Sequence, residues 1–197
     1  MRITFINHAC VKIDVDDFAI LCDPWLEGPA FNGGWDLLVQ TPMALASIME
    51  GVRYLWISHE HPDHFVPQFF SEISDQYAEK VTVLFHDTPD KRVKAFCEAR
   101  GFRVLEMQDR VPCALGGRMK AVCGRHHFYD SWLYLCDGDA SLLNLNDCQI
   151  RGAAETRKVA KVTGPPDVLL TQFSYAAWKG GRANTAYRTL QAERRLD

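Results

Sequence analysis

Three histidines and one aspartate gather in a segment of six residues, His59-Glu60-His61-Pro62-Asp63-His64. Imidazole nitrogens and carboxylate oxygens are ligands that zinc, iron and manganese accept without thiolates. The apolar residues 52–57 directly before the cluster predict a strand, which places the cluster in a loop at a strand end. Because the whole chain holds only seven histidines, this clustering favours a metal site over a polar surface loop.

The spacing within the cluster permits two ions. His59 and His61 are two residues apart and can face the same way in an extended segment. Asp63 and His64 then turn toward a neighbouring point, which permits a second ion about 3.5–4 Å from the first. Pro62 restricts the loop and lowers the entropy lost when an ion binds. We predict one or two zinc ions, with iron or manganese as alternatives.

The pattern His59-x-His61-x-Asp63-His64 after a strand resembles the HxHxDH motif of the metallo-β-lactamase superfamily. The resemblance implies that His59 and His61 bind a first ion and that Asp63 and His64 bind a second. It also implies a catalytic role for Asp63, which would orient or activate the attacking water.

Three further segments narrow the resemblance to one branch. Asn7-His8-Ala9 resembles the opening of the branch related to ascorbate-6-phosphate lactonase and N-acylphosphatidylethanolamine phospholipase D. Asp130-Ser131-Trp132-Leu133 and Leu145-Asn146-Asp147-Cys148 are similar to the domain of CMP-N-acetylneuraminate hydroxylase.

The resemblance implies a third histidine for the first ion, followed by an aspartate that bridges the two ions. Asp147 follows an apolar run and is the candidate bridging ligand; its alternative role is a turn residue or the N-cap of the next helix. His126 and His127 precede Asp147 by 21 and 20 residues, and either is a candidate third histidine, with a slight preference for His127. Asp130 is an outside candidate as a replacement ligand.

Other residues are expected around the ions rather than on them. Asp23 ends an early strand and is predicted to support a ligand. His8 either lines the substrate pocket or is structural. The loop of residues 27–40 holds Trp35 and three glycines, so it can act as a lid over the metal rim. The alternative is that its aromatic side chains pack into the core.

The order of predicted elements indicates an α/β fold. Strands with alternating apolar residues open the chain, helices and buried strands follow, and short strands fill residues 102–146. Helices are predicted from Thr41-Pro42 to about residue 50, over 67–77, after Thr88-Pro89 and near 149–161, with a buried strand at 168–170 and a helical tail. Two sheets covered by helices form one domain over residues 1–197, an αββα sandwich of the metallo-β-lactamase type.

The family's late histidine has no counterpart, because no histidine follows His127. We therefore expect the C-terminal part of the sandwich to be incomplete and the chain to be the N-terminal portion of a longer protein. The first ion should bind better than the second. An open sheet edge beside residues 168–170 predicts a homodimer.

The composition excludes several classes of partner. A net charge of −3 provides no basic field for nucleic acid, and no apolar run is long enough to span a membrane. Seven cysteines without a Cys-x-x-Cys pair, and a start without a signal-peptide pattern, favour reduced thiols and a cytoplasmic protein.

These features predict a metal-dependent hydrolase that acts on a small-molecule ester, lactone, amide or phosphodiester. The alternatives are a domain associated with sialic-acid-like nucleotide-sugar oxygenase chemistry and an inactive metal-binding fragment. Within these 197 residues no Rieske cysteine–histidine pairs occur.

Overall fold

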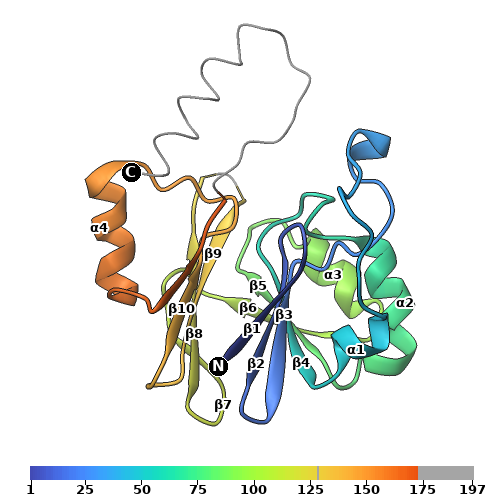
Figure 1. The fold of residues 1–197 in the computed structure, drawn as a ribbon, viewed down its shortest axis with the longest axis horizontal. Helices are drawn as coiled ribbons and strands as arrows, with labels where there is room; N and C mark the ends of the chain where they lie inside the picture. The colour runs from blue at the N-terminus through green and yellow to red at the C-terminus, as the bar shows by residue number, and fades with distance from the viewer. Residues whose placement is uncertain (128, 173–197) are drawn as a thin grey trace, which may run out of the picture.

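The computed structural model describes residues 1–127 and 129–172. Their first half forms a six-stranded sheet in the order β1-β2-β3-β4-β5-β6 (Figure 1). The strands are β1 (Arg2–Asn7), β2 (Cys10–Val15), β3 (Phe18–Cys22), β4 (Val52–Ile57), β5 (Thr82–His86) and β6 (Arg103–Met107). β1 to β3 pair antiparallel, whereas β3 to β6 run parallel and are joined through helices.

The second half forms a five-stranded sheet in the order β11-β10-β9-β8-β7. Its strands are β7 (Cys113–Gly116), β8 (Met119–Arg125), β9 (Ser131–Cys136), β10 (Ser141–Asn144) and β11 (Val168–Leu170). The helices are α1 (Leu45–Met49), α2 (Pro67–Tyr77), α3 (Arg92–Glu98) and α4 (Gly152–Thr163). Figure 1 shows α1, α2 and α3 outside the first sheet and α4 outside the second.

Three apolar layers hold these elements together and confirm the αββα sandwich. Strand alternation sends Val11, Ile13 and Val15 of β2 into the core between the two sheets. Leu21 of β3 faces the other way, into the core beneath α1, α2 and α3. A smaller cluster around Trp132 packs α4 against the second sheet.

Gly124 allows the Trp132 side chain of β9 to pack closely against β8. It lies opposite Trp132 in the β8–β9 pair, and a Cβ atom on Gly124 would lie 1.9 Å from Cζ2 of the Trp132 ring. Only glycine leaves room for the indole at this position. The packing fixes the start of β9, where Asp130 and Ser131 lie.

The bounds of α2 match the prediction, but the other three helices begin later than predicted, with α4 beginning at Gly152. α1 begins at Leu45 because Thr41 does not cap a helix: its hydroxyl donates to the Leu26 carbonyl and accepts from Asn7 Nδ2. Likewise the Thr88 hydroxyl bonds the Asp90 carbonyl, and α3 begins at Arg92. In both places the threonine stabilises the connecting loop instead of the helix end.

The strand predicted at 168–170 forms, but the prediction that it is buried was wrong. β11 pairs parallel with β10, but Val168 and Leu169 are 37% and 52% exposed. The polar tail of residues 182–197, predicted to be helical, lies outside the described residues. Over residues 1–127 and 129–172, no helix is long and apolar enough to cross a membrane. All seven cysteines are unpaired, as predicted.

Candidate metal centre

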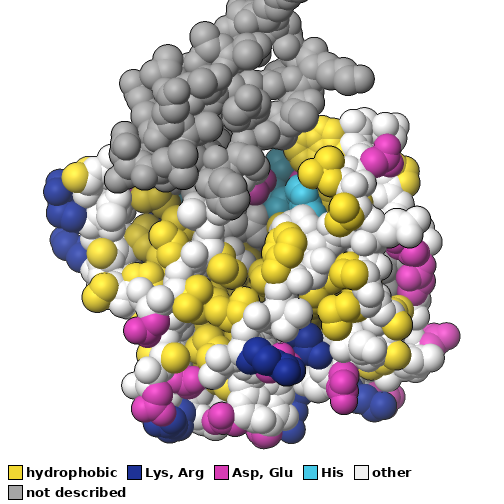
Figure 2. Space-filling model, viewed as in Figure 1, with side chains coloured by type: hydrophobic (Ala, Val, Ile, Leu, Met, Phe, Trp, Pro, Cys, Tyr) yellow, Lys and Arg dark blue, Asp and Glu magenta, His cyan; other side chains and the backbone are white. Residues whose placement is uncertain are grey.

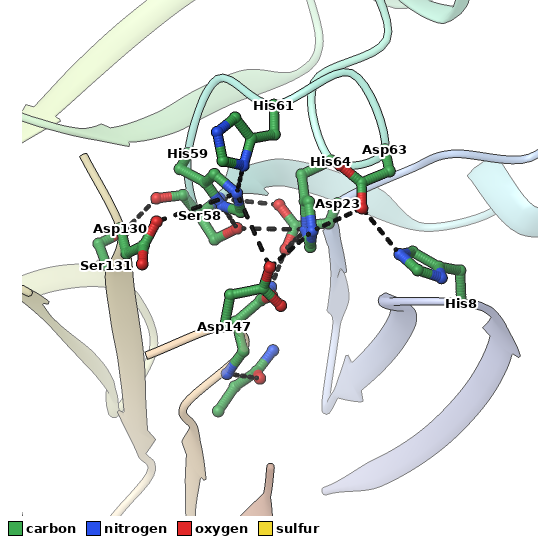
Figure 3. A network of polar contacts seen from close by, with 12 residues as sticks. His8, Asp23, Ser58, His59, His61, Asp63, His64, Asp130, Ser131 and Asp147 are labelled. Atoms are coloured by element: carbon green, nitrogen blue, oxygen red, sulfur yellow. Dashed lines mark hydrogen bonds and ion pairs between the residues drawn. The ribbon is translucent and has the colours of Figure 1, made fainter. Parts of the chain in front are cut away.

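Ionisable side chains from both sheets meet at one rim of the sandwich (Figure 3). The histidine segment follows β4 directly, and Asp23 follows the neighbouring parallel strand β3. Asp130 precedes β9, and Asp147 follows β10 after two residues. Because β3 and β4 are parallel, their carboxyl ends lie together at this rim. The Ser131 hydroxyl donates to the Ser58 carbonyl at 2.6 Å and thereby ties the second sheet to the histidine segment.

The buried carboxylate of Asp23 connects several residues of the rim. Its side chain is completely buried, and Oδ1 accepts the Ser58 N–H at 2.8 Å. Oδ2 accepts a hydrogen bond from Asn146 Nδ2 and lies 3.3 Å from His64 Nδ1. A carboxylate at Nδ1 orients the imidazole and leaves Nε2 free to bind a metal ion. The contacts agree with the predicted supporting role of Asp23.

A first group of candidate ligands surrounds Nε2 of His59. This atom lies 2.8 Å from Nδ1 of His61 and 4.0 Å from carboxylate oxygens of both Asp130 and Asp147. On the other side of the ring, Ser58 Oγ lies 2.9 Å from Nδ1 of His59. The hydroxyl therefore holds the ring with Nε2 facing the other three donors.

A second group surrounds Nε2 of His64. This atom lies 3.4 Å from Asp63 Oδ2 and 3.5 Å from Asp147 Oδ2. The same Asp147 oxygen thus approaches both His59 and His64. This position is the one expected of a ligand shared by two ions.

Two buried polar atoms at the rim support metal binding. Asp63 Oδ1 and His64 Nε2 have no hydrogen-bond partner among the described residues. Burying such atoms without a partner costs about 1–3 kcal/mol each. Cations satisfy both atoms at once, because each carries a free lone pair when the carboxyl is ionised and the imidazole is neutral. The residues present therefore fit a metal centre.

The charges at the rim are strongly coupled. Burial alone would lower the pKa of His64, but the carboxylates of Asp147, Asp23 and Asp63 outweigh it and raise that pKa well above its usual value. Burial would raise the pKa of Asp63, yet the neighbouring imidazoles of His64 and His8 hold that pKa well below its usual value. Without a cation, a proton on His64 balances these carboxylates. An ion that binds there must displace that proton.

His59 behaves differently from His64. Burial, reinforced by the nearby His64, lowers the pKa of His59 to about 4. Its imidazole is therefore neutral near pH 7 and retains the lone pair that a metal ligand requires.

The structure does not bring His126 or His127 to these groups. The His127 side chain is 72% exposed, and its Nε2 lies 3.9 Å from Glu155 of α4. His126 Nε2 donates to the Gln149 carbonyl at 3.1 Å. A tight turn, in which the His126 N–H bonds the Asp130 carbonyl, instead places Asp130 at the rim. Asp130, rather than His126 or His127, therefore lies where the third histidine was expected.

Three supporting residues were not predicted from the sequence. Ser58 contacts the His59 ring, Ser131 bonds the Ser58 carbonyl, and Asn146 bonds Asp23. Each contact depends on how the two sheets pack, so the sequence does not predict it. The one signal in the sequence is that these three residues lie at strand ends beside predicted ligands.

The loop of residues 27–40 borders the rim. The Phe31 ring centre lies 5.9 Å from that of His61, and the Trp35 ring centre lies 4.9 Å from that of Phe31. Neither aromatic residue belongs to a core cluster, and Phe31 is 40% exposed. Figure 2 shows histidine side chains reaching the surface beside hydrophobic ones. The loop therefore borders the rim and does not pack its aromatic side chains into a core cluster, and its role as a lid stays a prediction.

A separate cavity of 790 Å³ lies away from the metal rim, between this loop and helices α1 and α2. Its lining mixes apolar side chains, such as Ile48 and Phe69 at the helices, with polar ones, such as Glu72 of α2. No candidate metal ligand lines it.

The comparison with known families agrees with this fold. Residues 2–180 match the family described as "Beta-lactamase superfamily domain". Cytidine monophosphate-N-acetylneuraminic acid hydroxylase of Asterias rubens is 39% identical over 64 residues, which are 32% of this chain and 10% of that enzyme. The chain spans less than half the length of the first curated relatives that it matches.

Two solved structures share the fold. CmlA, a diiron beta-hydroxylase from Streptomyces venezuelae, superposes with a TM-score of 0.69 at 22% identity, over 99% of this chain and 40% of that one. A possible metal-dependent hydrolase from Veillonella parvula superposes with a TM-score of 0.69 at 15% identity, over 98% of this chain and 81% of that one. With the family match over most of its length, the chain belongs to the beta-lactamase superfamily.

Proposed function

We propose that this domain is a metal-dependent hydrolase that cleaves an ester, lactone, amide or phosphodiester bond of a small molecule. The observation that carries the proposal is the convergence of His59, His64 and Asp147, each of which offers a ligand atom within 4.8 Å of the other two. The neighbouring unpartnered oxygen of Asp63 extends this group toward a second position.

The donors divide between two ions. His59, His61 and Asp130 would hold the first, Asp63 and His64 the second, and Asp147 would bind both. Nitrogen and carboxylate donors without thiolate suit zinc, iron or manganese. When bound, such ions lower the pKa of water toward about 7 and polarise the bond to be broken.

Asp63 is suited to positioning the attacking water. The neighbouring imidazoles of His64 and His8 keep its carboxyl ionised, and both lie against Oδ2. Oδ1 is therefore left to accept a hydrogen bond from water, and its burial strengthens that bond. The aromatic loop beside His61 would cover the substrate from the solvent side.

The test is a set of hydrolysis assays with the zinc- and manganese-loaded protein. We would use p-nitrophenyl acetate, a simple lactone and bis(p-nitrophenyl) phosphate. Asp63→Asn should reduce kcat by about 10²–10⁴-fold, whereas Asp75→Asn, at an exposed position on α2, should not. Metal binding without turnover of any substrate class would instead favour an inactive metal-binding fragment.

A second function, in oxygenase chemistry on a nucleotide sugar, is favoured by Asp130. A carboxylate in place of a histidine makes the donor set richer in oxygen, which suits iron better than zinc. The similarity to a CMP-N-acetylneuraminic acid hydroxylase and to a diiron beta-hydroxylase supports the same direction. Iron as the metal bound after aerobic purification, with oxygen consumption by the iron-loaded protein and a reductant, would favour this function over hydrolysis.

A further inference from the structure

His8 occupies a strained position close to the second group of donors. It lies in the turn between β1 and β2, with φ at +46°. Residues other than glycine adopt this left-handed region at a conformational cost, and they persist there when the surrounding structure holds them. The β1–β2 turn thus places the imidazole at the rim despite a backbone cost.

The orientation of His8 is set by its neighbours. Its ring makes an edge contact with Trp25, with 4.9 Å between ring centres, and Trp25 Nε1 donates to the Gly28 carbonyl at 2.9 Å. Nε2 of His8 points toward Asp63 and lies 3.1 Å from Oδ2 (Figure 3). The His64 ring centre is 5.7 Å away on the same side.

We propose that His8 is itself a ligand of the second ion, together with Asp63 and His64 and with Asp147 as the shared carboxylate. The inference rests on the metal-dependent function proposed above. His8, Asp63 and His64 each offer a ligand atom within 4.8 Å of the other two. The buried, unpartnered atoms Asp63 Oδ1 and His64 Nε2 lie in this same group.

The distances fit one ion between His8, Asp63 and His64. Ligands that bind zinc tetrahedrally at about 2.1 Å lie about 3.4 Å apart. The observed separations are 3.1 Å from His8 Nε2 to Asp63 Oδ2 and 3.4 Å from Asp63 Oδ2 to His64 Nε2. Asp147 Oδ2 lies 3.5 Å from His64 Nε2 but outside this group of three, so its carboxylate must move to complete the coordination.

This ligand set changes two expectations from the sequence. His8 was predicted to line the substrate pocket or to be structural, and neither role requires that it bind metal. The second ion was expected to bind weakly. With two histidines and two carboxylates, the second position has as many donors as the first.

The experiment counts metal ions rather than turnover. Full-length metal-free protein is titrated with Zn²⁺ alone by calorimetry, and bound zinc is counted by mass spectrometry after gel filtration. We expect two ions per wild-type chain. His8→Asn should lose one of them or bind it about 100-fold more weakly, because a direct ligand is removed. Asparagine tolerates a positive φ, so the turn is retained.

Ala9→Ser, one residue further along the same turn, is the matched control and should bind two ions. Thermal melting of the metal-free proteins checks that His8→Asn is folded. If His8→Asn binds two ions with wild-type affinity, or if the wild type binds a single ion that the variant retains, His8 is not a ligand and the metal-dependent function still stands. If the wild type binds no ion, the proposed function itself is wrong.

Discussion

The two sheets contribute their candidate metal ligands to the rim in different ways. The first sheet presents His59, Asp63 and His64 directly after a central strand, and their side chains are at most 4% exposed. The second sheet contributes Asp130 and Asp147 from loops at strand ends, and these side chains are 24% and 33% exposed. The first sheet thus supplies buried, oriented imidazoles, and the second supplies carboxylates that are more exposed to solvent.

The difference follows from topology. In the first sheet, β4 is covered by helices on one side and by the other sheet on the other, so its end is dry and rigid. In the second sheet the donors lie in the turn before β9 and in the loop after β10. Buried histidines with fixed rings preorganise a site, and partly exposed carboxylates have room to adjust to an ion. Asp23 joins the two parts, since it bonds both Ser58 and Asn146.

The largest effect is expected from removing the Asp23 carboxylate, which bonds residues of both sheets. Asp23→Ala leaves the Ser58 N–H, the Asn146 amide and His64 without their buried partner. We expect the free energy of unfolding to fall by about 3–5 kcal/mol, together with a loss of metal binding. Urea unfolding of the metal-free protein measures the first effect. Asp17→Ala, at an exposed aspartate, serves as the control, and a loss below about 1 kcal/mol for Asp23→Ala would show that the two sheets do not depend on this residue.

The next prediction tests whether Asp130 or His127 is a ligand of the first ion. Asp130→Ala should weaken binding of the first zinc ion by about 100-fold, or about 2.7 kcal/mol, because its carboxylate lies near His59. His127→Ala should leave binding unchanged, because its side chain contacts Glu155 of α4 instead. Calorimetric titration with Zn²⁺ measures both. The opposite result would mean that the loop rearranges when the ion binds and that the histidine prediction was right.

A pH effect should arise at His86, the last residue of β5. Burial, with a further contribution from Arg125, lowers the pKa of His86 to about 4 from an ordinary value of 6.5. His86 is neutral in the folded protein, so its contribution to stability is present above pH 6.5 and is lost as the pH falls toward 4. Between pH 6.5 and pH 5 the loss should be about 1.5 kcal/mol.

The measurement compares the metal-free wild type with His86→Gln by urea unfolding at the two pH values. The stability difference between the two proteins should shrink by about 1.5 kcal/mol at the lower pH. If the difference in the free energy of unfolding does not change with pH, protonation of the His86 ring does not destabilise the folded protein. A local contact would then open at low pH and expose the ring.

The smallest effect is expected at the aromatic loop. Trp35→Ala should raise KM about fivefold, equivalent to about 1 kcal/mol, while the zinc content and the melting temperature stay unchanged. Steady-state kinetics on the best substrate and thermal melting measure these effects. Phe5→Ala, at another exposed aromatic residue on β1, should alter neither. If Trp35→Ala lowers the melting temperature and leaves KM unchanged, Trp35 acts in packing and the loop is not a lid.

The sequence by itself determined the local features of this protein. Apolar alternation predicted β1 to β3, and the proline at position 67 with the apolar spacing after it predicted α2. The chemistry and spacing of the segment after β4 predicted four candidate donors in it, because these residues are neighbours in the chain. Such features depend on contacts within a few residues, which periodicity and residue type record directly.

The tertiary structure decided which distant residues complete the rim. Asp130 rather than His126 or His127 faces His59, because a tight turn directs the histidines toward α4. Asn146 meets Asp23 across 123 positions in the sequence, and His8 meets Asp63 across 55. These contacts arise from the packing of two sheets and from one strained turn. No local pattern records them, because their geometry depends on the positions of both partners in space.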